Sequence, residues 1–145
     1  MRNRQISRTY LAIVEGIPRQ SGTISAPISR AADSVIERRI DFENGESAIT
    51  HYQLLEVKNN HSLLEIHLET GRTHQIRVHM ASIGHPIIGD PVYGLKKDRF
   101  SNIGGQCLHA AKLTLTHPKT GERMEFSASL PQYFTEVLDK LERMK

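Results

Sequence analysis

Two arginines, Arg72 and Arg77, lie at the start of a short predicted helix, where their side chains could bind an anion. They belong to residues 68–94, LETGRTHQIRVHMASIGHPIIGDPVYG, in which a Thr-Gly turn precedes the helix. The first turn of a helix has unpaired N–H groups and a partial positive charge, so arginines beside it add to an anion site. An arginine there can instead hold a carboxylate through two parallel hydrogen bonds and keep it ionised. The simpler alternative is that both side chains are solvated surface charges.

The histidines of this stretch raise the alternative of a metal site. His74, His79 and His85 could act as ligands, with Asp90 as a fourth. His74 and His79 are five positions apart, however, whereas two ligands on one helical face are four apart. We therefore expect no metal, and we expect His79 to be a hydrogen-bonding residue of the helix. Gly89-Asp90-Pro91, with Tyr93-Gly94 after it, is a turn sequence, so we expect these residues to be structural or to lie just behind the site.

Several strands should position this helix. Residues 9–15 are rich in β-branched and aromatic side chains, and residues 62–69 alternate apolar with polar side chains, as half-buried strands do. Residues 58–61 predict the turn of a hairpin. The region 30–41 is polar and has no clear pattern. The predicted strands are residues 9–15, 22–28, 48–57, 62–69, 108–116 and 124–130, with a turn at 117–121.

Two helices are predicted by apolar residues at helical spacing. Ile76, Met80 and Ile83 form one stripe of a helix that Thr73 should cap. A last amphipathic helix should open at Pro131. Its predicted inward face comprises Phe134, Val137, Leu138 and Leu141. With no internal repeat and no linker, the chain predicts one mixed α/β (α+β) unit.

The stretch 68–94 resembles the signature of the RluA-like family of RNA pseudouridine synthases, which modify large-subunit ribosomal RNA and some transfer RNAs. Shorter segments resemble other parts of that family in the expected order, from about residue 8 to residue 141. These supporting segments are residues 10–16 (YLAIVEG), 24–28 (ISAPI), 50–55 (THYQLL), 108–110 (LHA) and 124–131. The resemblance implies a largely antiparallel mixed sheet with a few flanking helices.

The resemblance also implies a reaction, the isomerisation of uridine to pseudouridine in RNA without a metal or organic cofactor. Tyr10 matches the tyrosine that packs on the uracil and is implicated in removing the C5 proton. Arg77 matches the basic residue that pairs with the catalytic aspartate. Leu108 matches an apolar side chain on the other face of the base. The predicted catalytic residues are therefore Tyr10 and Arg77, and the predicted substrate-binding residues are Arg72, His74, Gln75 and Leu108.

The motif that carries the family's catalytic aspartate, His-Arg-Leu-Asp followed by Thr-Ser-Gly, has no counterpart in this sequence. It should precede Tyr10, yet residues 1–9 contain no aspartate. We therefore expect residues 1–145 to be the C-terminal portion of one catalytic domain that is inactive alone. Such a portion would expose strand edges that favour self-association. It would also leave Arg77 without its carboxylate, so solvent or a substitute acid should reach this cation.

Composition sets looser bounds on function. A net charge of +3 favours RNA only weakly, and no apolar run approaches the roughly 20 residues that span a bilayer. The first residues lack the apolar stretch of a secretory signal, and a single cysteine, Cys107, is typical of a reducing, cytoplasmic setting. The leading interpretation is an RNA pseudouridine synthase. The alternatives are a non-catalytic RNA-binding remnant of the same fold and a metal-dependent hydrolase.

Overall fold

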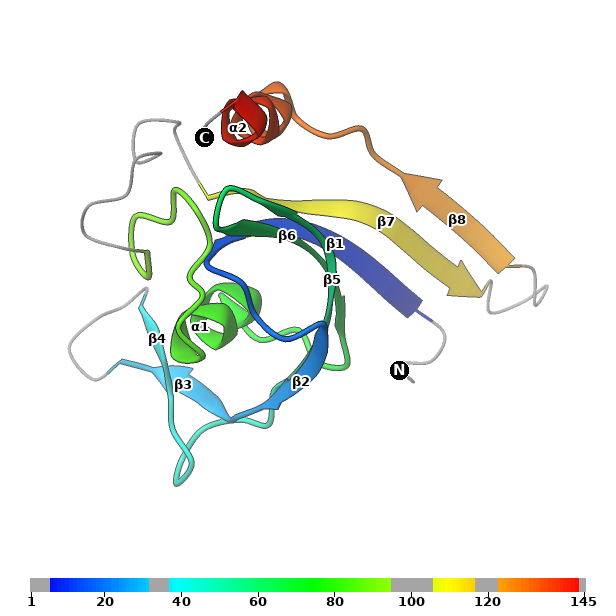
Figure 1. The fold of residues 1–145 in the computed structure, drawn as a ribbon. Coiled ribbons are helices and arrows are strands. Elements are labelled where there is room, and N and C mark those ends of the chain that lie inside the picture. Colours follow the sequence, from blue (N-terminus) through cyan, green and yellow to red (C-terminus); the bar gives the residue numbers. More distant parts are fainter. Residues whose placement is uncertain (1–5, 32–36, 95–105, 117–122, 144–145) are drawn as a thin grey trace.

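A six-stranded antiparallel sheet forms the centre of the structure, a computed structural model that describes residues 6–31, 37–94, 106–116 and 123–143 (Figure 1). The strand order in this sheet is β2-β5-β6-β1-β7-β8, and β3 and β4 form a separate antiparallel pair. The elements are β1 (Ile6–Glu15), β2 (Ser21–Ser25), β3 (Ile28–Arg30), β4 (Arg38–Ile40), β5 (Ile49–Lys58), β6 (His61–Leu68), α1 (Gln75–Ser82), β7 (Leu108–Thr116), β8 (Arg123–Ser127) and α2 (Gln132–Arg143). The predicted α+β class is confirmed, and every pair among the described strands is antiparallel.

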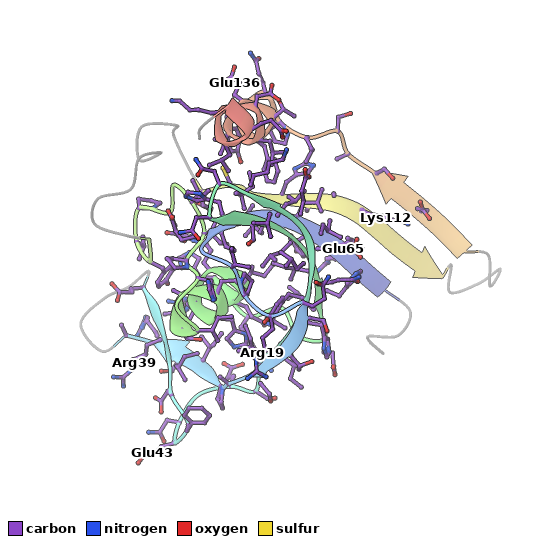
Figure 2. All side chains as sticks on the ribbon, viewed as in Figure 1. Arg19, Arg39, Glu43, Glu65, Lys112 and Glu136 are labelled. Carbon is purple, nitrogen blue, oxygen red and sulfur yellow. The ribbon has the colours of Figure 1, made fainter. Side chains whose placement is uncertain are left out.

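The sheet curves around α1, whereas α2 lies outside the curve (Figure 1). The central strand β1 is buried on both faces, since three consecutive side chains, Ala12, Ile13 and Val14, are fully enclosed. Apolar side chains of α1 and α2 belong to the same core as this strand. Charged side chains such as Arg39, Glu43 and Glu136 project from the periphery (Figure 2). Neither described helix is long and apolar enough to cross a membrane.

The hairpin of β5 and β6 confirms the strongest local prediction. Its loop contains only Asn59 and Asn60, which both have positive φ angles, 48° and 63°. Two positive φ angles are the requirement of a type I′ turn, and asparagine tolerates them better than most residues do. The hairpin delivers the end of β6 at Leu68 to the turn that precedes α1.

Three predicted details of the elements were wrong. The strand expected at 22–28 is interrupted, because β2 ends at Ser25 and β3 begins only after Pro27, which has no N–H to donate to a sheet. The closing strand ends at Ser127 instead of residue 130. Ile83 follows the last turn of α1 and is 38% exposed, so it does not continue the buried stripe of that helix.

Other predictions agree with the structure or fall beyond it. The strand at 108–116 is confirmed, and α2 buries Phe134, Val137 and Leu141 as expected. Residues 38–40, in the region without a clear pattern, form β4. The turn expected at 117–121 lies outside the described residues.

Gly22 gives a test of the packing at the edge strand β2. It pairs directly with Tyr52 of the neighbouring strand β5. A Cβ at position 22 would lie 2.7 Å from the Cε2 atom and 2.7 Å from the hydroxyl oxygen of Tyr52. Because Tyr52 is only 8% exposed, its ring has little room to move. Gly22→Ala should therefore lower the free energy of unfolding by about 1–3 kcal/mol, measured by urea denaturation.

Gly71→Ala is the matched control, because a Cβ there would meet no described atom within 4 Å. This variant should be as stable as the wild-type chain or slightly more stable. Equal loss of stability in both variants would contradict the packing that the structure describes around Gly22.

Candidate active site

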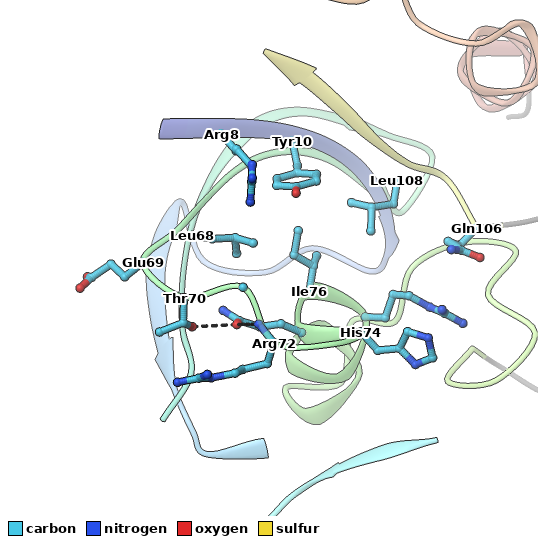
Figure 3. Close-up of a pocket in the computed structure, with 13 residues that line it drawn as sticks. Arg8, Tyr10, Leu68, Glu69, Thr70, Arg72, His74, Ile76, Gln106 and Leu108 are labelled. Atoms are coloured by element: carbon cyan, nitrogen blue, oxygen red, sulfur yellow. Dashed lines mark hydrogen bonds between the residues drawn. The ribbon is translucent and has the colours of Figure 1, made fainter. Parts of the chain in front are cut away.

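A cavity of about 390 Å³ opens between β1, the end of β6, the start of α1 and the start of β7 (Figure 3). We call it the Tyr10 pocket. All six residues singled out from the sequence contribute to its wall, although they are up to 98 positions apart (Leu108 minus Tyr10). The lining residues are Arg8, Tyr10, Leu68, Glu69, Thr70, Gly71, Arg72, His74, Gln75, Ile76, Arg77, Gln106 and Leu108. The structure brings these side chains together, and their individual roles stay predictions.

One part of the Tyr10 pocket is apolar. Figure 3 shows Tyr10, Leu68, Ile76 and Leu108 pointing into one space. Tyr10 and Leu108 reach it from neighbouring strands, because Tyr10 pairs with Ala110 of β7, and Leu108 is two positions from Ala110 and so shares its face. The register between β1 and β7 shifts at Thr9/Tyr10. Such bulges twist a strand locally and redirect side chains, so this one helps to aim Tyr10 at the cavity.

The turn before α1 is fastened by the buried side chain of Gln75. Its Oε1 accepts hydrogen bonds from the Thr70 hydroxyl (2.7 Å) and from the Arg72 N–H (3.0 Å). Its Nε2 donates to the Ile49 carbonyl (3.0 Å) and to Thr50 Oγ1 (2.9 Å). Both ends of the amide are thus engaged by the protein, which makes Gln75 a tie between the turn and β5. Its predicted contact with substrate stays a prediction.

His74 begins α1 in a left-handed conformation. Its φ of 57° and ψ of 19° are unusual for a residue other than glycine, and no side chain caps the helix, so the cap predicted at Thr73 was wrong. The left-handed backbone turns the His74 side chain toward Tyr93, whose hydroxyl is 2.8 Å from His74 Nδ1. Strained backbone of this kind persists only where neighbouring contacts hold it.

Arg77 forms a two-pronged ion pair with Asp90. Its Nε donates to Oδ2 at 2.8 Å and its Nη2 to Oδ1 at 2.9 Å, and the two side chains are only 11% and 0% exposed. Of the two expected partners of this cation, solvent or an acid, the structure shows an acid, Asp90, in contact with it. Asp90 is a close-by structural partner, as its turn sequence predicted.

The environment keeps both members of the pair charged. Burial by itself raises the pKa of Asp90, but hydrogen bonds from Arg77 and from the N–H groups of Tyr93 and Val92 outweigh it and hold the pKa below 3.8. The hydrogen bond to Asp90 also raises the pKa of Arg77, against the opposing effect of burial. The result is an ionised pair whose geometry is set by the turn at residues 90–93.

Tyr93 connects this pair to the rest of the site, from a turn that the sequence predicted to be structural or to lie just behind the site; its partners were not predicted. The Tyr93 hydroxyl oxygen accepts a hydrogen bond from the backbone N–H of Arg38 (2.7 Å). The hydroxyl proton can therefore be donated to His74 Nδ1. The Tyr93 ring lies 5.1 Å from the Arg77 guanidinium carbon, within reach of a cation–π interaction. Burial and the nearby charges of Arg77 and Arg38 lower the pKa of His74, which suits an acceptor role for Nδ1. The only sequence signal was a tyrosine within a turn motif.

Comparison with known proteins identifies the family. A family model described as RNA pseudouridylate synthase matches residues 1–82, more than half of the chain. The chain belongs to this RNA pseudouridylate synthase family. It is 45% identical over 139 residues to an uncharacterized RNA pseudouridine synthase of Chloroflexus aurantiacus, covering 96% of this chain and 43% of that protein. It is 41% identical over 152 residues to ribosomal large subunit pseudouridine synthase D of Haemophilus influenzae, covering 97% of this chain and 47% of that protein.

Solved structures agree with this assignment. Human RNA pseudouridylate synthase domain containing 1 superposes with a TM-score of 0.76 at 26% identity, covering 97% of this chain and 67% of the human one. A second human protein, RNA pseudouridylate synthase domain containing 4, superposes with a TM-score of 0.74. The chain spans less than half the length of the curated relatives that it matches, 43% and 46% for the first two.

His79 and His85 make hydrogen bonds within the fold. His79 is fully buried in α1, where Nδ1 lies 2.8 Å from Thr50 Oγ1 and Nε2 lies 2.8 Å from the Ala26 carbonyl, so its predicted hydrogen-bonding role is confirmed. Burial lowers its pKa. His85 Nδ1 is 2.8 Å from the Glu15 carbonyl. In the part of the chain that the structure describes, no three His, Cys, Asp or Glu residues are grouped to hold a metal ion.

Glu69 is the acidic residue among those lining the Tyr10 pocket, but its carboxylate points away from the cavity (Figure 3). It bonds with His51 on the outer side of the sheet, where its side chain is 56% exposed. Neither Glu69 nor Asp90, which is committed to Arg77, is therefore directed at the space between Tyr10 and Leu108.

The Arg77–Asp90 pair predicts a stability effect. Asp90→Asn removes one charge of a buried pair and leaves the guanidinium uncompensated, so it should lower the free energy of unfolding by about 3 kcal/mol. Glu69→Gln, which alters an exposed pair, should change it little. Denaturant titration of both variants measures the difference, and similar values for the two would contradict a structural role for the buried pair.

The same pair predicts a pH dependence. Since the pKa of Asp90 is lower in the folded chain than in the unfolded chain, its contribution is complete above about pH 4 and declines as the pH falls below that value. The wild-type chain should therefore lose stability more steeply than Asp90→Asn below about pH 4. Parallel stability curves in that range would contradict the lowered pKa.

Proposed function

We propose that this chain forms the uracil-holding part of an RNA pseudouridine synthase, which isomerises uridine to pseudouridine in ribosomal or transfer RNA. The observation that carries the proposal is the convergence of Tyr10, Leu108 and Arg77 on one pocket in a member of this family. The relatives named for the large ribosomal subunit favour ribosomal RNA as the substrate and a cytoplasmic location.

The pocket suits a reaction in which a base is detached and turned before it is rejoined. The glycosidic bond to N1 of uracil breaks, and C5 then bonds to the sugar while its proton leaves. Tyr10 and Leu108, with Leu68 and Ile76 beside them, provide apolar surfaces that retain the free base and limit its movement. We propose that the Tyr10 hydroxyl accepts the proton that leaves C5. Gln106 and the turn at Arg72 close the sides of the cavity.

Arg77 is the proposed anchor of the attacking carboxylate. Asp90 occupies its Nε and Nη2 atoms, so Nη1 is the guanidinium nitrogen left to serve a second acid. We propose that this acid is the family's aspartate, supplied by sequence outside these 145 residues, which would form the C-terminal portion of the catalytic domain. Asp90 then fixes the orientation of Arg77 before the second carboxylate arrives, an example of preorganisation.

A fusion tests this function. The chain alone should not isomerise uridine. A fusion that joins the N-terminal half of the Bacillus subtilis relative to this chain should isomerise uridine, because the two proteins are 44% identical where they align. In the active fusion, Tyr10→Phe should lower kcat by about 10²–10⁴-fold with a smaller effect on KM, because the ring that packs on the base remains. Arg77→Ala should abolish detectable turnover.

Tyr52→Phe is the matched control, since Tyr52 lies outside the Tyr10 pocket and this variant should keep the full rate. Thermal unfolding of each variant separates loss of activity from loss of folding. A fusion with full activity after Tyr10→Phe would show that the site is misplaced, and isomerisation by the chain alone would contradict the need for an outside aspartate. RNA binding without turnover in every fusion would favour the non-catalytic alternative.

We also propose that the chain self-associates through a sheet edge. Among the described strands, β2 and β8 lie at the two ends of the sheet, and β8 extends away from the two helices (Figure 1). An edge strand has unpaired backbone groups that can bind another copy. Light scattering of the chain should give a mass that rises with concentration, and a constant monomer mass would contradict the proposal.

A further inference from the structure

A second cavity, of about 430 Å³, adjoins the Tyr10 pocket on the side of β3 and β4. We call it the Arg30 cleft, after one of the arginines that line it together with Arg38 and Arg72. Gly71 and Arg72 line both cavities, so the two are joined at the turn before α1. The cleft, like the Tyr10 pocket, has three arginines in its wall, but it lacks the group of apolar side chains around Tyr10.

The strand register places two of these arginines side by side. Arg30 of β3 is directly opposite Arg38 of β4, and side chains opposite each other on an antiparallel pair share one face. Like charges in that position repel and destabilise the pair. Within the described residues, no ion pair involves Arg30. Arg30 therefore brings to this face a positive charge that no described carboxylate pairs with.

The third arginine, Arg72, is held at the junction of the two cavities. Its Nε donates to the Ser47 carbonyl at 2.8 Å, and its Nη1 lies 2.9 Å from Glu46. Among the described residues that line the cleft, Glu46 is the acidic side chain, and it pairs with Arg72 and not with Arg30. Arg72 remains 38% exposed and can meet a ligand at the rim of either cavity.

We propose that the Arg30 cleft binds backbone phosphates of the RNA strand that enters the Tyr10 pocket. This inference rests on the proposed function. A uridine inserted in the pocket remains attached to its neighbouring nucleotides, so its backbone must leave across the rim, where Arg72 stands. Guanidinium groups match phosphate oxygens in geometry and charge, and contacts of this kind position a nucleic acid without reading its sequence. The cleft thus orients the strand, and the pocket receives the base.

Arg39 provides an internal control on the same hairpin. It neighbours Arg38 on β4 but points to the other face, and it lies at the periphery of the molecule, with Nη2 3.7 Å from Asp41 (Figure 2). A variant of Arg39 removes the same charge from the same strand without altering the cleft. General attraction between a basic protein and RNA would make Arg39 and Arg38 equivalent, whereas a built phosphate site would not.

The test is binding of a fluorescent single-stranded, uridine-containing RNA to the 145-residue chain over a series of salt concentrations. Arg30→Ala and Arg38→Ala should each weaken binding roughly three- to tenfold at low salt and reduce the slope of log K against log salt by about 0.7. Arg39→Ala should leave both quantities unchanged. An unlabelled poly-glutamate peptide should compete poorly for the cleft.

Several outcomes would overturn the proposal: equal effects of Arg39→Ala and Arg30→Ala, no RNA binding by the wild-type chain, or displacement of RNA by poly-glutamate as effective as by unlabelled RNA. The measurement is independent of catalysis. If the fusion isomerises uridine but Arg30→Ala binds RNA normally, only the cleft proposal fails. If Arg30→Ala weakens binding but no fusion isomerises uridine, the proposed reaction fails and the phosphate cleft stands.

Discussion

The buried ion pair between Arg77 and Asp90 is the contact on which the arrangement of both cavities depends. Arg77 belongs to α1, and Asp90 follows a segment that is hydrogen-bonded to the central strand, since the Ile88 N–H donates to the Ile13 carbonyl at 2.9 Å. The pair therefore fastens the helix to the middle of the sheet. A buried pair adds little net stability compared with apolar packing, but its two-pronged geometry restricts how the helix can rotate.

The same turn extends this constraint to the edge of the molecule. Asp90 accepts the N–H groups of Val92 and Tyr93, and this places the Tyr93 hydroxyl between His74 and the backbone of Arg38. One side chain thus holds the left-handed start of α1 and the strand β4. Since His74 lines the Tyr10 pocket and Arg38 lines the Arg30 cleft, a single turn sets the relative position of the two cavities.

Local patterns in the sequence predicted much of the fold, and contacts between distant residues account for what they missed. The β5–β6 hairpin follows from side-chain alternation and an Asn-Asn turn, and α2 follows from apolar residues at helical spacing; all of these patterns act within a few residues. The six predicted site residues were brought together as the resemblance implied. The Tyr93 bonds to His74 and Arg38 span 19 and 55 positions, and no local period records them. The left-handed His74 was missed for the same reason, because distant partners stabilise it against its own backbone preference.

Under the proposed function, the two adjacent cavities divide the recognition of RNA between different physical interactions. Apolar packing in the Tyr10 pocket acts at short range and is sensitive to the shape of one base, whereas charge in the Arg30 cleft acts over several ångströms and is weakened by salt. Arg72 belongs to both, and its bonds to Glu46 and Ser47 tie it to the segment that leads into β5. Because β5 is also held by Gln75 through Ile49 and Thr50, the charged rim and the apolar interior are attached to the same strand. Under the proposed function, a strand bound in the cleft is therefore presented to the pocket at a fixed distance, which limits the positions that an inserted nucleotide can take.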